Sequence, residues 1–233
     1  MAAIRTKKKS LKVFFAGELF DLKHLIGNAY LAEAIYEKSH GRYLCALPQD
    51  FDARGTAPRT TRDHHIRSLV GCDVALFSFD GPDLDSGTLV EFMLAKFADI
   101  PSVVLRSDRR GAGAKGPSWN PMASFFPRTA VLAIDGPGAY RKILKKRHRK
   151  VDEVIRLAGQ HSSADAQRMC DEVAGAVVRA LDRVRALQPA MPRHLREAVY
   201  DWISAMPGLR GKEKALRREF EKYLEVKVQK DLI

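Results

Sequence analysis

The stretch Val74-Ala-Leu-Phe-Ser-Phe79, followed after a short polar loop by Asp85-Ser-Gly-Thr-Leu-Val-Glu91, decides the fold predicted for this chain. The first segment is an apolar run typical of a buried strand. The second begins a helix, because aspartate is a favoured N-cap. Glu91 follows Asp85 by about 1.7 helical turns, and helical side chains lean towards the N-terminus. Both carboxylates are therefore expected at the carboxyl end of the strand, where open α/β sheets bind ligands. Two carboxylates in different environments can divide the cleavage of a glycosidic bond, one as nucleophile and one handling protons.

Strand and helix patterns alternate along the first part of the chain. The predicted strands are 11–17, 43–47, 73–79, 101–105 and 130–134, and the predicted helices are 19–38, 61–71 and 86–98. This alternation is typical of an α/β fold in which helices cover both faces of a parallel sheet. We therefore expect a basic N-terminal tail at residues 1–10 and one α/β domain at residues 11–140.

Residues 141–233 carry helical periodicity and show no strand pattern. Helices are predicted at 151–158, 164–187, 193–206 and 212–228, separated by Gly159, Pro189, Pro192, Pro207 and Gly208. Val173, Val177, Leu181 and Val184 share one helix face, which must pack against another surface. We expect a C-terminal α-helical extension that covers the α/β domain or supports assembly.

The formal net charge is +12, and most of it lies in the first 150 residues. Residues 1–150 hold 25 Lys and Arg against 15 Asp and Glu, whereas residues 151–233 hold 15 against 13. Because the helical extension is almost neutral and shows no DNA-binding helix signature, nucleic acid is not the expected partner. No apolar run reaches the ~18 residues of a membrane span, and none follows the charged N-terminus as in a secretory signal. Three scattered cysteines without metal-ligand spacing suit reduced thiols, so we expect a cytoplasmic protein that binds no metal.

Five short segments follow one another in a particular order. They are Phe14-Phe-Ala-Gly17, Cys72-Asp-Val-Ala75, Asp85-x-Gly-Thr-x-x-Glu91, Ser107-Asp-Arg-Arg110 and Asn120-Pro-Met122. This order resembles the nucleoside 2-deoxyribosyltransferase family over roughly residues 11–135, and the Asp-x-Gly-x-x-x-Glu element is its most specific part. The resemblance implies a flavodoxin-like fold and the transfer of a 2-deoxyribosyl group from a nucleoside to another nucleobase, without a cofactor.

The resemblance also implies roles for single residues. Glu91 matches the nucleophile that attacks the anomeric carbon and holds a glycosyl ester, and Asp85 matches the carboxylate that handles protons beside the departing base. Gly17 matches a turn where the backbone comes close to the ligand, which glycine permits because it has no Cβ. Asn120 and Met122 match an element that reaches the sugar site from a neighbouring subunit. The resemblance therefore implies a homodimer or a larger homo-oligomer.

Further candidates for substrate binding surround these positions. Gln49 and Asp50 end a predicted strand at the ligand edge and are candidates for base recognition. Gly87 lies inside the most specific motif. Arg109 is a candidate for holding a phosphate, because a phosphate needs cationic partners. Phe14 is expected in the core and as a wall of the cleft.

Two positions depart from the pattern of the family. Relatives usually carry tyrosine in place of Phe14, and its hydroxyl orients the nucleophilic glutamate; they commonly carry Asp or Asn in place of His65. Losing a hydrogen bond to a catalytic carboxylate costs a few kcal/mol unless another donor replaces it. His65 is a candidate proton donor to the leaving base, since the unperturbed pKa of histidine lies near neutrality.

Two alternatives to base transfer stay open at the level of the sequence. The first is an N-glycosidase that hydrolyses a nucleoside 5′-monophosphate, which the positive charge of residues 1–150 and Arg109 favour. The second is a non-catalytic protein that binds nucleotides or nucleic acid. Salt-sensitive binding of RNA or DNA without base exchange would identify this second alternative.

Overall fold

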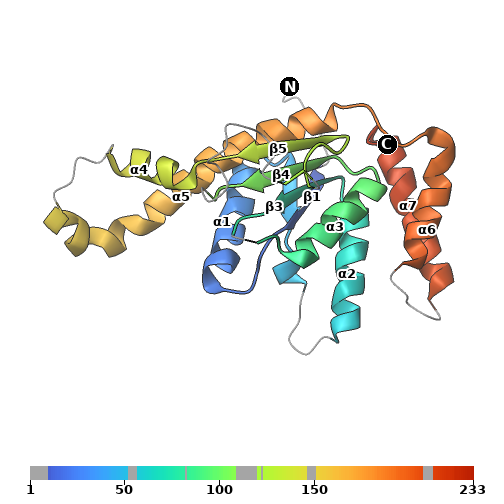
Figure 1. Ribbon diagram of the computed structural model, residues 1–233, viewed down its shortest axis with the longest axis horizontal. Coiled ribbons are helices and arrows are strands. Elements are labelled where there is room, and N and C mark those ends of the chain that lie inside the picture. Colours follow the sequence, from blue (N-terminus) through green and yellow to red (C-terminus); the bar gives the residue numbers. More distant parts are fainter. Residues whose placement is uncertain are drawn as a thin grey trace, which may run out of the picture.

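A parallel sheet of five strands forms the centre of the computed structural model (Figure 1). The structure describes residues 10–51, 57–81, 83–108, 120–121, 123–145, 151–206 and 212–233, without the side chains of residues 151–162. The strands are β1 (Leu11–Ala16), β2 (Tyr43–Ala46), β3 (Val74–Ser78), β4 (Ser102–Arg106) and β5 (Thr129–Ala133). Their order is β2-β1-β3-β4-β5, and every neighbouring pair is parallel. This is the strand order of the flavodoxin-like fold, so the predicted fold is confirmed.

The central strands consist of apolar runs because both of their faces are covered. All residues of β4 are buried, and in β3 only Ser78 is partly exposed. Val13 on β1 pairs with Cys45 of β2 on one side and with Val74 of β3 on the other. A strand buried on both faces cannot alternate apolar and polar residues, which explains the continuous runs in the sequence.

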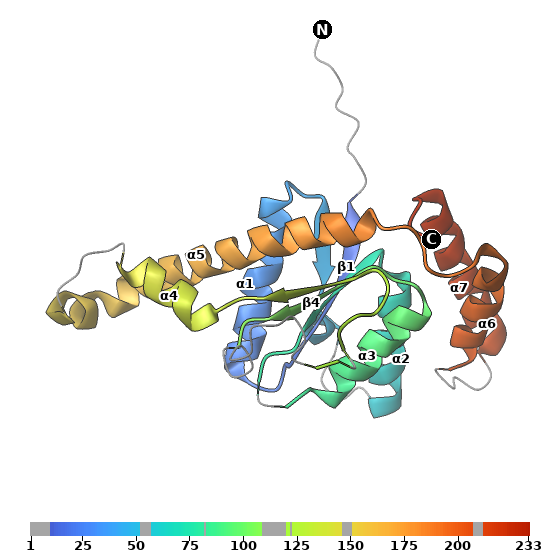
Figure 2. The same cartoon turned by 45° about the horizontal axis from the view of Figure 1, so that its top comes forward.

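Helices α1 (Leu22–Lys38) and α5 (Val151–Arg185) cover one face of the sheet (Figure 2). Asp21 caps α1, since its side chain accepts a hydrogen bond of 2.9 Å from the amide of His24. Apolar side chains from both helices and from the strands form one buried cluster, which includes Val13, Phe15, Leu31, Ile35, Leu76, Val103, Val177, Leu181 and Val184. The apolar stripe of α5 thus packs on the sheet.

Helices α2 (Pro58–Gly71) and α3 (Ser86–Phe97) cover the other face. Helices α6 (Arg196–Ala205) and α7 (Glu213–Gln229) lie beside them, near the amino ends of the strands (Figure 1). Their buried cluster with the strands includes Phe14, Leu69, Phe77, Phe92, Val104, Tyr200, Ile203, Leu216 and Phe220. The C-terminal extension therefore contributes to both buried clusters, through α5 to one and through α6 and α7 to the other.

Two features of the extension differ from the sequence prediction. Helix α4 (Gly136–Lys145) was not predicted. At its start, Asp135 accepts a hydrogen bond of 2.9 Å from the amide of Gly138, and Pro137 lies in the first turn. An acidic cap followed by proline is a helix-start signal. Helix α5 is continuous where two helices were predicted on either side of Gly159. A single glycine costs a helix about 1 kcal/mol relative to alanine, which weakens the helix without having to end it.

Polar contacts reinforce the attachment of the extension. Asp182 of α5 accepts hydrogen bonds from Arg42 Nη1 at 2.8 Å and from the hydroxyl of Tyr43 at 2.7 Å. Just before β5, Arg128 donates through Nη2 to the carbonyl of Leu232 at 2.6 Å. Within the described ranges, no helix has the length and apolar character needed to cross a membrane. The basic tail predicted at residues 1–10 lies outside the described residues except for Ser10.

Candidate active site

The loops that leave the carboxyl ends of β3 and β4 are joined by one carboxylate. Asp80 Oδ1 accepts hydrogen bonds from the amides of Ser107 at 2.5 Å and Asp108 at 2.9 Å, and Oδ2 accepts one from the Ser107 hydroxyl at 2.7 Å. Asp108 in turn accepts from the amide of Gly81 at 3.1 Å. Asp80 was not among the predicted site residues; its position directly after a buried strand was the available signal. These bonds fix the loop from which α3 begins.

Asp85 caps α3, as predicted. Its Oδ2 accepts hydrogen bonds of 2.7 Å from both the amide and the hydroxyl of Thr88, which is buried. A Cβ on Gly87 would lie 3.3 Å from the same Oδ2, so glycine leaves this carboxylate room at the start of the helix. Within the part of the chain that the structure describes, no donor contacts Asp85 Oδ1. Asp85 is therefore a fixed carboxylate with one oxygen directed away from the cap.

Glu91 and His65 form a direct contact between α3 and α2. The distance from His65 Nδ1 to Glu91 Oε1 is 2.8 Å. Only 18% of the His65 side chain and 13% of the Glu91 side chain are exposed. An ionised carboxylate only accepts hydrogen bonds, so Nδ1 carries the proton when Glu91 is ionised. The structure thus brings together two of the three predicted catalytic residues in a partly dehydrated setting, where such a bond is stronger than in water.

Phe14 and Gly17 lie at the end of β1 and take part in packing. The ring of Phe14 is completely buried, with its centroid 6.4 Å from that of Phe77. Its hydrophobic role agrees with the expectation, but the side chain reaches no surface in this conformation. A Cβ on Gly17 would lie 3.1 Å from Cβ of Ser78. The glycine therefore permits a close approach of β1 to β3 at this point.

The remaining predicted residues are dispersed around the same edge. Gln49 Nε2 donates to the carbonyl of Leu25 at 3.0 Å, which directs this amide towards α1, whereas Asp50 is exposed at the end of the short 3-10 helix η1 (Pro48–Asp50). Asn120 is partly exposed, and its carbonyl accepts a hydrogen bond of 3.2 Å from the amide of Ala123. Met122 and Arg109 lie outside the described residues.

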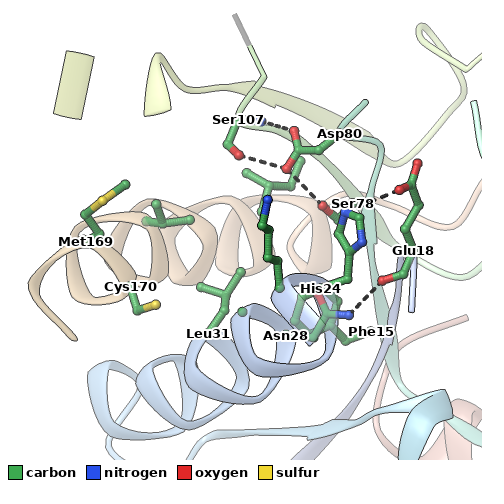
Figure 3. A pocket seen from close by; sticks show the side chains of 14 residues that line it. Phe15, Glu18, His24, Asn28, Leu31, Ser78, Asp80, Ser107, Met169 and Cys170 are labelled. Atoms are coloured by element: carbon green, nitrogen blue, oxygen red, sulfur yellow. Dashed lines mark hydrogen bonds and ion pairs between the residues drawn. The ribbon is translucent and has the colours of Figure 1, made fainter. Parts of the chain in front are cut away.

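A cavity of about 290 Å³ opens between α1 and α5 (Figure 3). Two polar side chains of its lining contact Glu18: His24 Nε2 lies 3.2 Å from Glu18 Oε2, and Asn28 donates to the carbonyl of Glu18 at 3.1 Å. Among the described residues, none of the predicted site residues lines this cavity, although Ser78, Asp80 and Ser107 do. Since α1 and α5 cover the opposite face of the sheet from α2 and α3, the cavity is separate from the contact between His65 and Glu91.

Metal ligation finds no support in the described ranges, which contain no group of three His, Cys, Asp or Glu side chains able to hold an ion. The chemistry available at the site is that of Glu91, His65 and Asp85. It consists of a carboxylate held by a hydrogen-bond donor and a second carboxylate fixed at a helix N-terminus. Such an arrangement suits attack on an electrophilic carbon coupled to proton transfer.

Comparison with known proteins identifies no family for this chain. No protein-family model matches the chain, and no curated protein matches it. One solved structure with similarity is that of a conserved protein from Enterococcus faecalis, with 29% sequence identity and a TM-score of 0.43. The similarity covers 46% of this chain and 70% of that chain.

Proposed function

We propose that the protein cleaves the N-glycosidic bond of a 2′-deoxynucleoside through a covalent glycosyl ester on Glu91 and passes the sugar to a second nucleobase. The observation that carries this proposal is the 2.8 Å contact between His65 Nδ1 and Glu91 Oε1. It makes Glu91 a largely buried carboxylate that is held by a donor from a different helix. The resemblance of the surrounding motif to nucleoside 2-deoxyribosyltransferases supplies the substrate class.

The reaction proceeds in two displacements at the anomeric carbon. A carboxylate oxygen of Glu91 bonds to this carbon while the bond to the base nitrogen breaks, and the electron pair leaves with the base, which takes up a proton. Asp85 donates that proton from Oδ1, because Oδ2 accepts the hydrogen bonds from Thr88. A nitrogen of the second base then attacks the anomeric carbon, the bond to Glu91 breaks, and Asp85 takes up the proton that this nitrogen loses. Each transition state has oxocarbenium character, which the neighbouring carboxylate stabilises.

His65 takes the part that the tyrosine hydroxyl plays in relatives. The position of that tyrosine is occupied by Phe14, whose buried ring has no donor. His65 Nδ1 supplies a hydrogen bond to Glu91 from a different helix instead. The earlier expectation was a proton transfer from His65 to the leaving base. Because Nδ1 is directed at Glu91, we now assign His65 to orienting the nucleophile.

Hydrolysis of a nucleoside 5′-monophosphate is the second candidate. It is favoured by the excess of 25 Lys and Arg over 15 Asp and Glu in residues 1–150, since an anionic substrate is attracted by such a surface. The same ester on Glu91 serves both reactions. They differ only in whether water or a second base attacks it.

The deciding experiment offers the protein a 2′-deoxynucleoside with and without a second free base, and in parallel the matching 5′-monophosphate. A new nucleoside is expected only when the second base is present, and Glu91→Gln should produce none. A bound base held close to the anomeric carbon outcompetes water because of proximity. Consumption of the monophosphate alone, without any new nucleoside, would replace transfer by hydrolysis. No consumption in any sample, together with salt-sensitive binding of nucleic acid, would support the non-catalytic alternative.

We extend the proposal to a homodimer or larger homo-oligomer, on the expectation that Asn120 reaches the site of a neighbouring subunit. Mixing inactive Asn120→Ala and Glu91→Ala subunits should then restore part of the activity, because some mixed sites contain both native residues. A mixture as inactive as its components, with exchange of subunits shown by mass, would remove Asn120 from the shared site.

A further inference from the structure

Helix α2 lies between α3 and α7 in both views of the molecule (Figures 1 and 2). On the side of α3 it presents His65, which contacts Glu91 at 2.8 Å. On the side of α7 it presents Arg67, which contacts Glu219. Two residues apart on a helix are about 200° apart in rotation, so the two side chains leave α2 on nearly opposite sides. Helix α2 therefore contacts α3 on one side and α7 of the C-terminal extension on the other.

The contact with α7 is a hydrogen-bonded ion pair with a third member. Arg67 Nη2 lies 2.9 Å from Glu219 Oε2, and Arg67 Nε lies 3.1 Å from Oε1. The hydroxyl of Tyr223 donates to Glu219 Oε1 at 2.5 Å. Burial acts to raise the pKa of Glu219, but the bonds from Arg67 and Tyr223 outweigh it and hold the pKa below its ordinary value. A forked arginine–carboxylate pair fixes orientation as well as distance.

Close packing surrounds this ion pair. A Cβ on Gly71 would lie 3.1 Å from Cζ of Tyr223, so the ring packs directly on the backbone of α2. Where α2 ends, Lys227 of α7 donates to the carbonyl of Cys72. Apolar residues of the two helices belong to the same buried cluster, with Ile66, Leu69 and Val70 from α2 and Leu216, Phe220 and Leu224 from α7. The two helices are therefore joined by an ion pair, a hydrogen bond and apolar packing.

We propose that Glu219 and Tyr223 are positioning residues that act through Arg67 to set the placement of α2 and hence the hydrogen bond from His65 to Glu91. This inference rests on the proposed function of Glu91. It gives the C-terminal extension a role in the reaction besides covering the sheet. A shift of α2 of a few tenths of an ångström would lengthen the bond to Glu91 while leaving the sheet intact. Misplacement by about 1 Å can cost a factor on the order of 100 in rate.

The test compares Glu219→Gln and Tyr223→Phe with a control pair in the same extension. Arg217 of α7 and Asp201 of α6 also form a hydrogen-bonded ion pair, but neither is bonded to α2. Asp201→Asn is therefore the matched control for losing a charge in this region. Two quantities are measured on the full-length variants: the ¹⁵N and ¹H signals of the His65 imidazole, and kcat and KM for base exchange.

Glu219→Gln is expected to shift the His65 Nδ1 signal and to lower kcat about 10-fold with little change in KM, within the range known for misplaced catalytic groups. Tyr223→Phe should give a smaller effect in the same direction, and Asp201→Asn should leave both quantities unchanged. Unchanged His65 signals in Glu219→Gln would overturn the positioning role, as would equal effects in the Asp201→Asn control. An inactive wild-type protein would defeat the proposed function alone, because the imidazole signals still report whether α7 positions His65.

Discussion

Replacement of His65 tests the orienting role that the structure assigns to it. The atom that contacts Glu91 is Nδ1, at 2.8 Å from Oε1. The side-chain nitrogen of asparagine occupies nearly the place of a histidine Nδ1, whereas glutamine places its nitrogen nearer to that of Nε2. His65→Asn therefore keeps a donor towards Glu91. His65→Phe keeps the ring without any donor, and His65→Gln moves the donor away.

The expected loss follows from the kind of hydrogen bond. A bond to a charged group contributes about 1.5–3 kcal/mol, and both side chains here are less than one-fifth exposed, so water replaces it poorly. If the bond orients Glu91 in the transition state, its removal lowers kcat by a factor on the order of 10 to 150. His65→Phe and His65→Gln should both fall in this range, and His65→Asn should retain most of the activity.

Steady-state base exchange provides the assay, with the thermal unfolding midpoint of each variant as a control for folding. A His65→Phe protein with the kcat of the wild type would refute the orienting role. So would a His65→Asn protein as slow as His65→Phe, since retention of the Nδ1-like donor is the feature that distinguishes them.

Three further perturbations test other parts of the structure. Asp85→Asn should still cap α3, because Asn caps about as well as Asp, but should lower the exchange rate by a factor on the order of 10²–10⁴; unchanged kinetics would reduce Asp85 to a cap. Burial lowers the pKa of Lys227 to about 8. Between pH 8 and 10.5, Lys227 is therefore protonated in the unfolded chain but neutral in the folded protein. The free energy of unfolding should rise across that window by an amount on the order of 3 kcal/mol. Denaturant titrations at several pH values should show a larger rise in the wild type than in Lys227→Met, because Lys96, whose pKa burial lowers to about 7, titrates in both proteins; equal pH profiles would contradict it. Removal of residues 141–233 uncovers apolar side chains on both faces of the sheet, and should abolish cooperative unfolding measured by circular dichroism; an unchanged midpoint would show that the extension is dispensable.

The strands were predictable because their surroundings require unbroken apolar runs. The strand predicted at 73–79 is β3 (Val74–Ser78) with one residue less at each end, and the cap at Asp85 followed from residue type and position. Helix α4 was missed because its sequence is dominated by Gly, Pro and basic residues, which are also typical of loops. The continuity of α5 across Gly159 was missed because glycine is a common helix-end signal, although one glycine costs a helix only about 1 kcal/mol.

In the candidate site too, local features were predictable from the sequence and tertiary contacts were not. The spacing of Asp85 and Glu91 on one helix is a local property and was visible in the sequence. The contact between His65 and Glu91 is not local, because it depends on the relative rotation of α2 and α3 on the sheet. The closeness of Gly17 to Ser78 likewise depends on the pairing of β1 with β3. A sequence pattern can select the helix that carries a site, but the partner of each side chain comes from the tertiary packing.

The covalent intermediate on Glu91 is the most direct test of the whole account. The protein is mixed with a 2′-deoxynucleoside in the absence of a second base, quenched in acid, digested and analysed by mass spectrometry. We expect a 2-deoxyribosyl adduct on the peptide that contains Glu91, formed in the wild type and absent in Glu91→Gln. An adduct on another residue, or a fully active Glu91→Gln protein, would contradict the central claim.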